Sequence, residues 1–185
     1  MRDYALPLDD DGIYHIFNRA VGHEKLFLND VAYKHFLNKI TDHLLPHIDI
    51  WSYCLMPNHF HLLAELKPES KGLIVSKAIS NCCNGYTKWI NGISGRKGSL
   101  FMRPFKRVKI ENDEHLAQII WYIHRNPIHH HYVNTLEEWK YSSYNSMFSH
   151  NSFVATQKVI QFFGGTEAFI EFHKLQFGDI LDALE

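Results

Sequence analysis

Runs of alternating apolar and polar residues predict strands along much of the chain. The run over 12–21 places Ile13, His15 and Phe17 on one strand face and the residues between them on the other, as a period of two requires. The turn residues Pro57-Asn58 separate two further runs closely enough to predict a β-hairpin. The other predicted strands cover residues 48–55, 59–66 and 105–110.

Between these runs, apolar residues at helical spacing predict helices. Asn29 or Asp30 is a suitable N-cap for the first helix, and Pro46 stops it. A long helix is predicted over 71–91. Another helix begins at Asp113, and we expect Pro127 to end it, because the residue before a proline resists the helical conformation. Two short helices follow, over about 154–163 and 166–177.

The predicted order is strand, helix, strand, strand, helix, strand, and then an added helix. This is the order of a ferredoxin-like sandwich, an α+β fold in which two helices cover one face of an antiparallel four-stranded sheet. The added helix carries Tyr122. We expect residues 1–148 to form the main domain and residues 149–185 to form a helical C-terminal extension packed on it.

Composition indicates an ordinary globular protein, with 45% hydrophobic and 21% charged residues. The N-terminus lacks the apolar core of a signal peptide, and no apolar stretch approaches transmembrane length. These features predict a cytoplasmic protein with no membrane partner. The three cysteines, Cys54, Cys82 and Cys83, have neither disulfide nor metal-site spacing, so we expect free, buried thiols.

Positive charge is concentrated in one segment although the net charge is only −1. Residues 85–109 contain no Asp or Glu, which suits a short nucleic-acid footprint. The alternative is a solvated loop and strand edge. The candidate phosphate contacts in this segment are Arg96, Lys97, Arg103, Lys106, Arg107 and Lys109. Arg19, at the end of the first predicted strand, is a further candidate.

Two histidines at alternate positions begin the third predicted strand. His59 and His61 share a strand face, and two imidazoles placed this way can bind one divalent metal ion. Tyr122 lies off the apolar stripe of its helix, with Asn126 one turn later on the same side. The alternative for Tyr122 is a boundary tyrosine whose ring is packed and whose hydroxyl is wet.

Several motifs in this order resemble the single-tyrosine HUH transposases, and more closely their REP-associated branch. The likeness spans roughly residues 12–145. The matching segments are Tyr14-His15-Ile16-Phe17-Asn18-Arg19, Met56-Pro57-Asn58-His59-Phe60-His61-Leu62-Leu63, Gly98-Ser99-Leu100-Phe101, Phe105-Lys106-Arg107, Tyr122-Ile123-His124-Arg125-Asn126-Pro127 and Trp139-Lys140-Tyr141-Ser142-Ser143-Tyr144.

The resemblance implies a metal-dependent transposase that cleaves and transfers single-stranded DNA at hairpin or REP-like ends. It implies that His59, His61 and Asn126 hold Mg²⁺ or Mn²⁺, and that Tyr122 attacks phosphorus to give a 5′-phosphotyrosine link and a free 3′-hydroxyl. Residues 1–148 would then be the catalytic domain. Because two imidazoles and an amide are a weak, neutral ligand set, we expect Mn²⁺ to bind better than Mg²⁺ and occupancy to be low without DNA.

The chain departs from the family pattern after Pro127. Where the family has a basic residue and a glycine turn, this chain has Ile128-His129-His130-His131-Tyr132. We expect these histidines to form an exposed turn that partly replaces the positive charge.

Other interpretations fit the same residues. The chain could be a domesticated relative that binds hairpin nucleic acid as a regulator, with weak or lost cleavage. It could also be a metal phosphodiesterase that uses water, with Tyr122 in a structural role. The sequence leaves open whether the protein is a monomer or a homodimer, and whether the tyrosine serves its own histidines or those of a partner.

Overall fold

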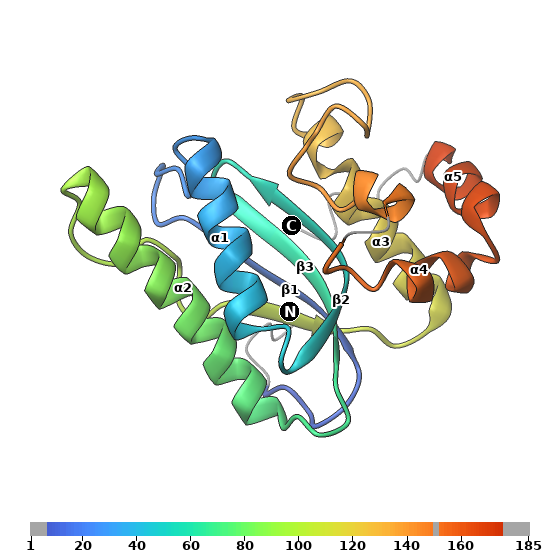
Figure 1. Cartoon of the computed structure of the whole chain (residues 1–185), viewed down its shortest axis with the longest axis horizontal. Coiled ribbons are helices and arrows are strands. Elements are labelled where there is room, and N and C mark those ends of the chain that lie inside the picture. The colour runs from blue at the N-terminus through green and yellow to red at the C-terminus, as the bar shows by residue number, and fades with distance from the viewer. Residues whose placement is uncertain (1–6, 150–151, 176–185) are drawn as a thin grey trace.

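The computed structural model describes residues 7–149 and 152–175. The chain folds around one antiparallel sheet with strand order β2-β3-β1-β4 (Figure 1). This order and the alternation of strands and helices confirm the predicted ferredoxin-like α+β sandwich. The elements are β1 (Ile13–Arg19), α1 (Asp30–His43), β2 (Ile48–Met56), β3 (His59–Leu66), α2 (Gly72–Ser94), β4 (Lys106–Lys109), α3 (Asp113–His129), a 3-10 turn η1 (Asn145–Phe148), α4 (Thr156–Phe163) and α5 (Thr166–Lys174).

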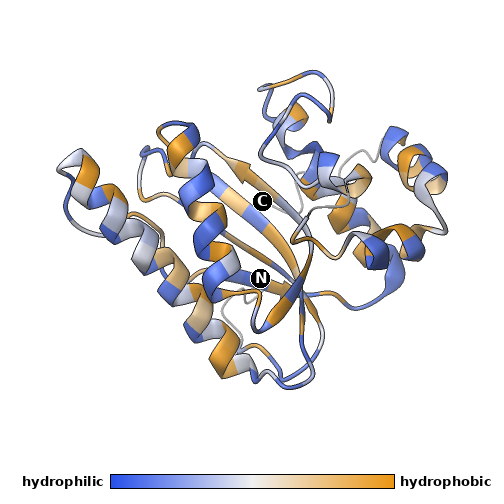
Figure 2. Cartoon of the chain, viewed as in Figure 1, coloured by the Kyte–Doolittle hydropathy of each residue, from blue (hydrophilic) through white to orange (hydrophobic). Residues whose placement is uncertain are grey.

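Helices cover both faces of the sheet. On one face, α1 and α2 pack together, and the ring of Phe36 on α1 meets that of Phe60 on β3 at a centroid distance of 5.2 Å. On the other face, α3 lies against β2 and β3. The central strands are mostly hydrophobic, as expected for strands covered on both sides, whereas the outer helices have one hydrophobic and one hydrophilic face (Figure 2).

The helix α3 does not end at Pro127, contrary to the sequence prediction. It continues to His129 with the proline inside its last turn. A proline there removes one backbone hydrogen bond, but the next turn still closes, because the His130 N–H donates to the Asn126 carbonyl at 3.0 Å. Packing of α3 against the sheet outweighs this local cost.

The C-terminal helices are anchored to the sheet and to α3. The backbone N–H of Ala155, just before α4, donates to the Ile50 carbonyl of β2 at 2.8 Å. Lys158 on α4 forms ion pairs with Asp49 and Glu65, and the Trp121 indole N–H donates to the Leu175 carbonyl. The helix α5 ends at Lys174 and Leu175 is extended, so the predicted continuation to Phe177 is wrong at Leu175; residues 176 and 177 lie outside the described residues.

The three cysteines are buried free thiols, as the sequence predicted. Burial raises the pKa of Cys83 to about 12, so this thiol is unreactive at neutral pH. None of the helices in the described parts of the chain is long and apolar enough to cross a lipid bilayer.

A buried chain of hydrogen bonds links α5 to β2 through α3. His173 Nδ1–H donates to the Phe169 carbonyl, so its Nε2 accepts from His124 Nδ1–H at 2.9 Å. The Ser143 hydroxyl then donates to His124 Nε2 at 2.8 Å, and Ser143 Oγ accepts the Tyr53 backbone N–H. This pattern needs both rings neutral, and burial lowers the pKa of His173 to about 4.

We expect acid to destabilise the fold through this pair. Because the pKa of His173 is about 4 when folded and about 6.5 when unfolded, the unfolded state binds more protons between these values. Stability is therefore full above pH 6.5 and falls towards pH 4, by about 3 kcal/mol for one such group. His173→Gln keeps an acceptor for His124 but cannot be protonated, so urea unfolding should show a shallower loss for this variant. An unchanged pH profile would contradict this role.

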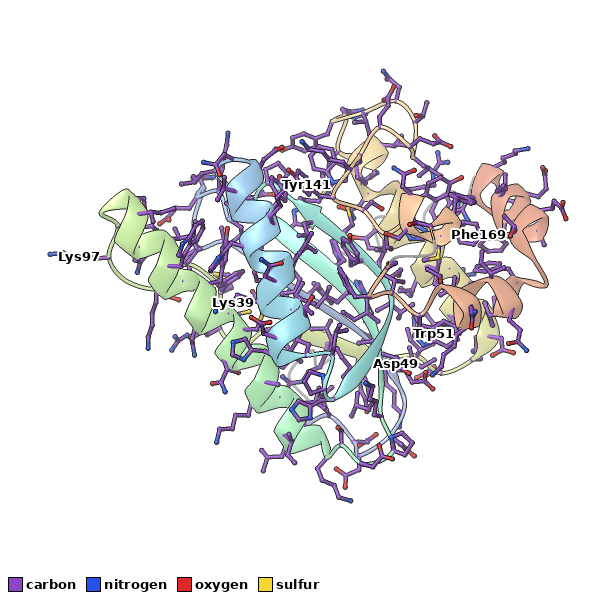
Figure 3. All side chains as sticks on the ribbon, viewed as in Figure 1. Lys39, Asp49, Trp51, Lys97, Tyr141 and Phe169 are labelled. Carbon is purple, nitrogen blue, oxygen red and sulfur yellow. The ribbon has the colours of Figure 1, made fainter. Side chains whose placement is uncertain are left out.

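Arg96 holds the loop after α2 in place. Its guanidinium forms an ion pair with Glu24 and donates to Asn91 Oδ1 at 2.8 Å and to the Ser99 carbonyl at 2.6 Å. The neighbouring Lys97 points away from the protein (Figure 3). The two adjacent basic residues therefore have different environments.

Arg96→Ala should release this loop, whereas Lys97→Ala should not. Loss of the guanidinium leaves the Ser99 carbonyl and Asn91 without their charged donor, so local opening becomes easier. A glycine- or leucine-directed protease is used in place of trypsin, because each substitution removes a trypsin site. In limited proteolysis, cleavage near residues 95–100 should be several times faster in Arg96→Ala than in Lys97→Ala. Equal cleavage rates in the two variants would refute the structural role of Arg96.

Candidate active site

The two histidines of the predicted metal pair lie on the sheet face that α3 covers. His61 is buried, whereas His59 is half-buried and lies nearer to solvent. Phe60 between them points to the opposite layer, against Phe36 and Phe101. The alternation of β3 therefore separates polar site residues from the apolar core beneath α1 and α2.

Helix α3 brings Tyr122 and Asn126 to these histidines within one chain. Asn126 Oδ1 lies 2.9 Å from His59 Nε2, and Asn126 Nδ2 lies 3.4 Å from His61 Nε2. The edge of the His61 ring meets the Tyr122 ring with centroids 5.3 Å apart. All four residues that the sequence singled out as catalytic or metal-binding thus form one cluster.

Tyr122 is completely buried, with none of its surface exposed. The alternative of a boundary tyrosine with a wet hydroxyl is therefore wrong. The apolar stripe predicted only one buried helix face, but the C-terminal segment covers α3 from the other side through Trp121 and His124. The helix is consequently buried nearly all round at 121–124.

The structure adds His15 to the cluster, a residue that sequence reasoning placed on a strand face without a role. Because the Asn126 amide donates to His61 Nε2, the His61 Nδ1 carries the proton and donates to His15 Nε2 at 2.9 Å. Burial lowers the pKa of His15 to about 3, which keeps it a neutral acceptor. The predicted fold already paired β1 with β3, and this pairing could have indicated that His15 lies beside His61.

The expected exposed histidine turn is corrected at two positions, because both His129, the last residue of α3, and His130 are half-buried. His130 is half-buried, and its ring lies 5.1 Å from that of His59. The continuation of α3 past Pro127 turns His130 towards the site, while His131, with a φ of 58°, is exposed. Burial, followed by the neighbouring imidazoles of His15, His59 and His130, lowers the pKa of His61 well below its usual value.

The cluster offers oxygen and nitrogen donors at separations suited to one small cation. Ligands that bind side by side at octahedral Mg²⁺ or Mn²⁺ are about 3 Å apart, close to the 2.9 Å that separates Asn126 Oδ1 from His59 Nε2. The His59 Nδ1–H donates to Asn58 Oδ1, which leaves Nε2 directed at Asn126. In the described residues, no three His, Cys, Asp or Glu side chains converge as a metal site. The candidate donors are two imidazoles and an amide oxygen, which are neutral.

The predicted phosphate contacts fall into two groups. Arg96 and Lys109 are engaged in ion pairs with Glu24 and with Asp9 and Asp11, respectively. Exposed cationic residues include Arg19, which pairs in register with His59, and Lys97. Around β4 lie Arg103, Lys106 and Arg107, with the Lys106 ammonium 5.6 Å from the centre of the Phe17 ring.

The chain was compared with known proteins. No family model matches it. Over 101 residues, or 50% of this chain, it is 28% identical to a Haemophilus influenzae protein described as "Putative REP-associated tyrosine transposase", and it spans only about half of that relative, 56% of its length. A solved structure of a REP-associated tyrosine transposase bound to a REP hairpin matches with a TM-score of 0.66 and 16% identity, over 81% of this chain and 87% of that one.

The solved structure confirms the fold alone, because a sequence identity of 16% is too low to show a shared activity. The curated relative independently points to the same group through sequence. Together, these two comparisons confirm the resemblance of this chain to the REP-associated tyrosine transposases.

Proposed function

We propose that this protein cleaves and rejoins single-stranded DNA at hairpin ends through a covalent link to Tyr122. The observation that carries this proposal is the contact of Tyr122 with His61 in a cluster that also holds His59 and Asn126. A protein that only binds DNA has no need of a buried tyrosine beside a potential metal-binding group. The names of the two similar proteins support a transposase of this type.

In this proposal, His59, His61 and Asn126 hold Mg²⁺ or Mn²⁺. A bound divalent ion would polarise the scissile phosphate and offset the charge that builds on its oxygens. The half-buried position of His59 leaves the outer side of the cluster nearest to solvent, where a phosphate can approach. The neutral donor set favours weak binding until a DNA phosphate adds its own negative charge.

Tyr122 then acts as the nucleophile. Its oxygen loses the phenol proton and forms a bond to phosphorus, while the bond from phosphorus to the 3′-oxygen breaks and that oxygen takes up a proton. The 5′ side stays attached as a phosphotyrosine diester. Because this link is again a phosphodiester, attack by another 3′-hydroxyl rejoins strands without an external energy source and releases Tyr122.

The burial of Tyr122 sets a condition on this reaction. A fully buried hydroxyl cannot reach a phosphate on the surface, so α3 or the tyrosine side chain must move when DNA binds. The same burial favours a second candidate, a hairpin-binding regulator whose cleavage is weak or lost. The two candidates differ in whether a covalent product forms.

We expect the protein to form a denaturant-resistant adduct with a 3′-labelled hairpin DNA in the presence of Mn²⁺, and Tyr122→Phe to lose it by at least a hundredfold. The phenyl ring keeps the packing against His61 but has no oxygen to attack phosphorus. Adducts can be counted on a denaturing gel.

Tyr132→Phe is the matched control, because Tyr132 is half exposed and its ring packs against Trp139 instead of the rings of the cluster. This variant should form the adduct normally. Cleavage by both the wild type and Tyr122→Phe would support the water-using phosphodiesterase, and binding without cleavage would support the regulator.

His15 should act as a positioning residue for the ion. His15→Leu leaves the Nδ1–H of His61 without an acceptor. Loss of a hydrogen-bond partner of a metal-binding histidine typically weakens metal binding ten- to a hundredfold. His15→Gln restores an acceptor oxygen and should recover most of the affinity. Electron paramagnetic resonance of Mn²⁺ measures binding directly. Equal affinity of His15→Leu and the wild type would remove His15 from the metal site.

A further inference from the structure

A groove with a volume of about 550 Å³ lies on the other side of the sheet edge from the candidate active site. One wall is α2, and the other is the segment leading into β4. Its size is within the range of sites that bind small molecules, about 300–1,000 Å³, and so suits a nucleotide rather than a duplex. Polar residues that line it include Ser76, Ser80, Asn84, Thr87, Arg103 and Arg107.

The charge of this groove favours an anionic ligand. Both walls belong to a stretch, residues 70–110, that contains no Asp or Glu but many Lys and Arg. Among the described residues, the lining includes two arginines and no carboxylate. Phosphate groups are the ligands that such a surface recognises.

The polar groups of the groove can also recognise bases. Arg103 Nη2 donates to Asn84 Oδ1 at 3.1 Å and so spans the two walls. The Ser80 and Thr87 hydroxyls donate to carbonyls of their own helix, which leaves their oxygens as acceptors. Phe101 and Phe105 supply apolar lining. Acceptors, an arginine and aromatic carbon together suit unpaired nucleotides, whose base edges and faces are both accessible.

The position of β4 connects the groove with the active site. Residues of β4 alternate between the two sheet faces: Lys106 pairs with Phe17, and Arg107 pairs with Ile16. The Phe17 ring stacks on His15 and His61, so Lys106 lies on the active-site face. Arg107 lies on the groove face. Because β4 is a short edge strand, one DNA strand can cross it and contact both sides.

We propose that the groove between α2 and β4 binds unpaired nucleotides of the same DNA strand that Tyr122 cleaves. This inference rests on the proposed function and adds a second contact to it. The groove holds the single-stranded flank of a hairpin, and the edge strand leads that flank to the histidine cluster.

The test compares two labelled DNA hairpins, one blunt and one with a ten-nucleotide oligothymidine extension, by fluorescence anisotropy. The wild type should bind the extended hairpin more tightly. Arg103→Ala removes the spanning cation, and Ser80→Trp fills the groove. Both variants should weaken binding of the extended hairpin about tenfold and change binding of the blunt hairpin less than twofold.

Two controls make the result specific. Asn81→Trp adds the same bulky side chain to an exposed position of α2 outside the groove lining, and Lys34→Ala removes one positive charge from α1 outside the groove; both should bind like the wild type. Equal affinity of the wild type for the two hairpins, or losses in Lys34→Ala as large as in Arg103→Ala, would overturn the groove site. Groove-dependent binding without any Tyr122 adduct would instead refute the proposed cleavage and leave the groove site standing.

Discussion

A row of hydrogen-bonded side chains between the sheet and α3 organises the candidate active site. His15 accepts from His61, and Asn126 contacts both His61 and His59, so the row runs from β1 through β3 to the helix. The tautomer of His61 is fixed, because the Asn126 amide nitrogen donates to its Nε2 and His15 Nε2 accepts from its Nδ1. The polar groups would be costly at a buried helix–sheet interface if they were unpaired. Paired in this way, they fix the height and rotation of α3 over the sheet.

The C-terminal helices complete this arrangement from the other side of α3. His124, two residues after Tyr122, joins His173 on α5 and Ser143 next to β2. The helix is therefore held between two polar networks, one towards the sheet and one towards the extension. This explains why Tyr122 is fully buried, and it means that any exposure of its hydroxyl must involve the packing of α3. The extension is thus part of the environment of the site and not a separate appendage.

The sheet edge has a different role from the buried layer. Strand β4 has only four residues, and its alternation places basic side chains on both faces. A short, positively charged edge strand avoids pairing with other chains, and it places cationic groups on both sides of the sheet edge. By contrast, Arg96 stabilises a loop and Lys109 forms ion pairs with the N-terminal aspartates. Position in the fold, more than sequence proximity, separates the cations that stabilise a loop or the N-terminal segment from those that we propose contact DNA.

The sequence by itself determined the sheet, its helices and the two histidines on one strand face, because strand alternation and helical spacing are local properties. The choice of Tyr122 and Asn126 depended on motif order. The tertiary structure alone decided the rest. Pro127 lies inside α3 because packing outweighs one lost hydrogen bond, and His130 consequently turns towards His59. His15 and the burial of Tyr122 depend on which strands and helices become neighbours, and such contacts join residues too far apart in the chain for any local pattern to reveal.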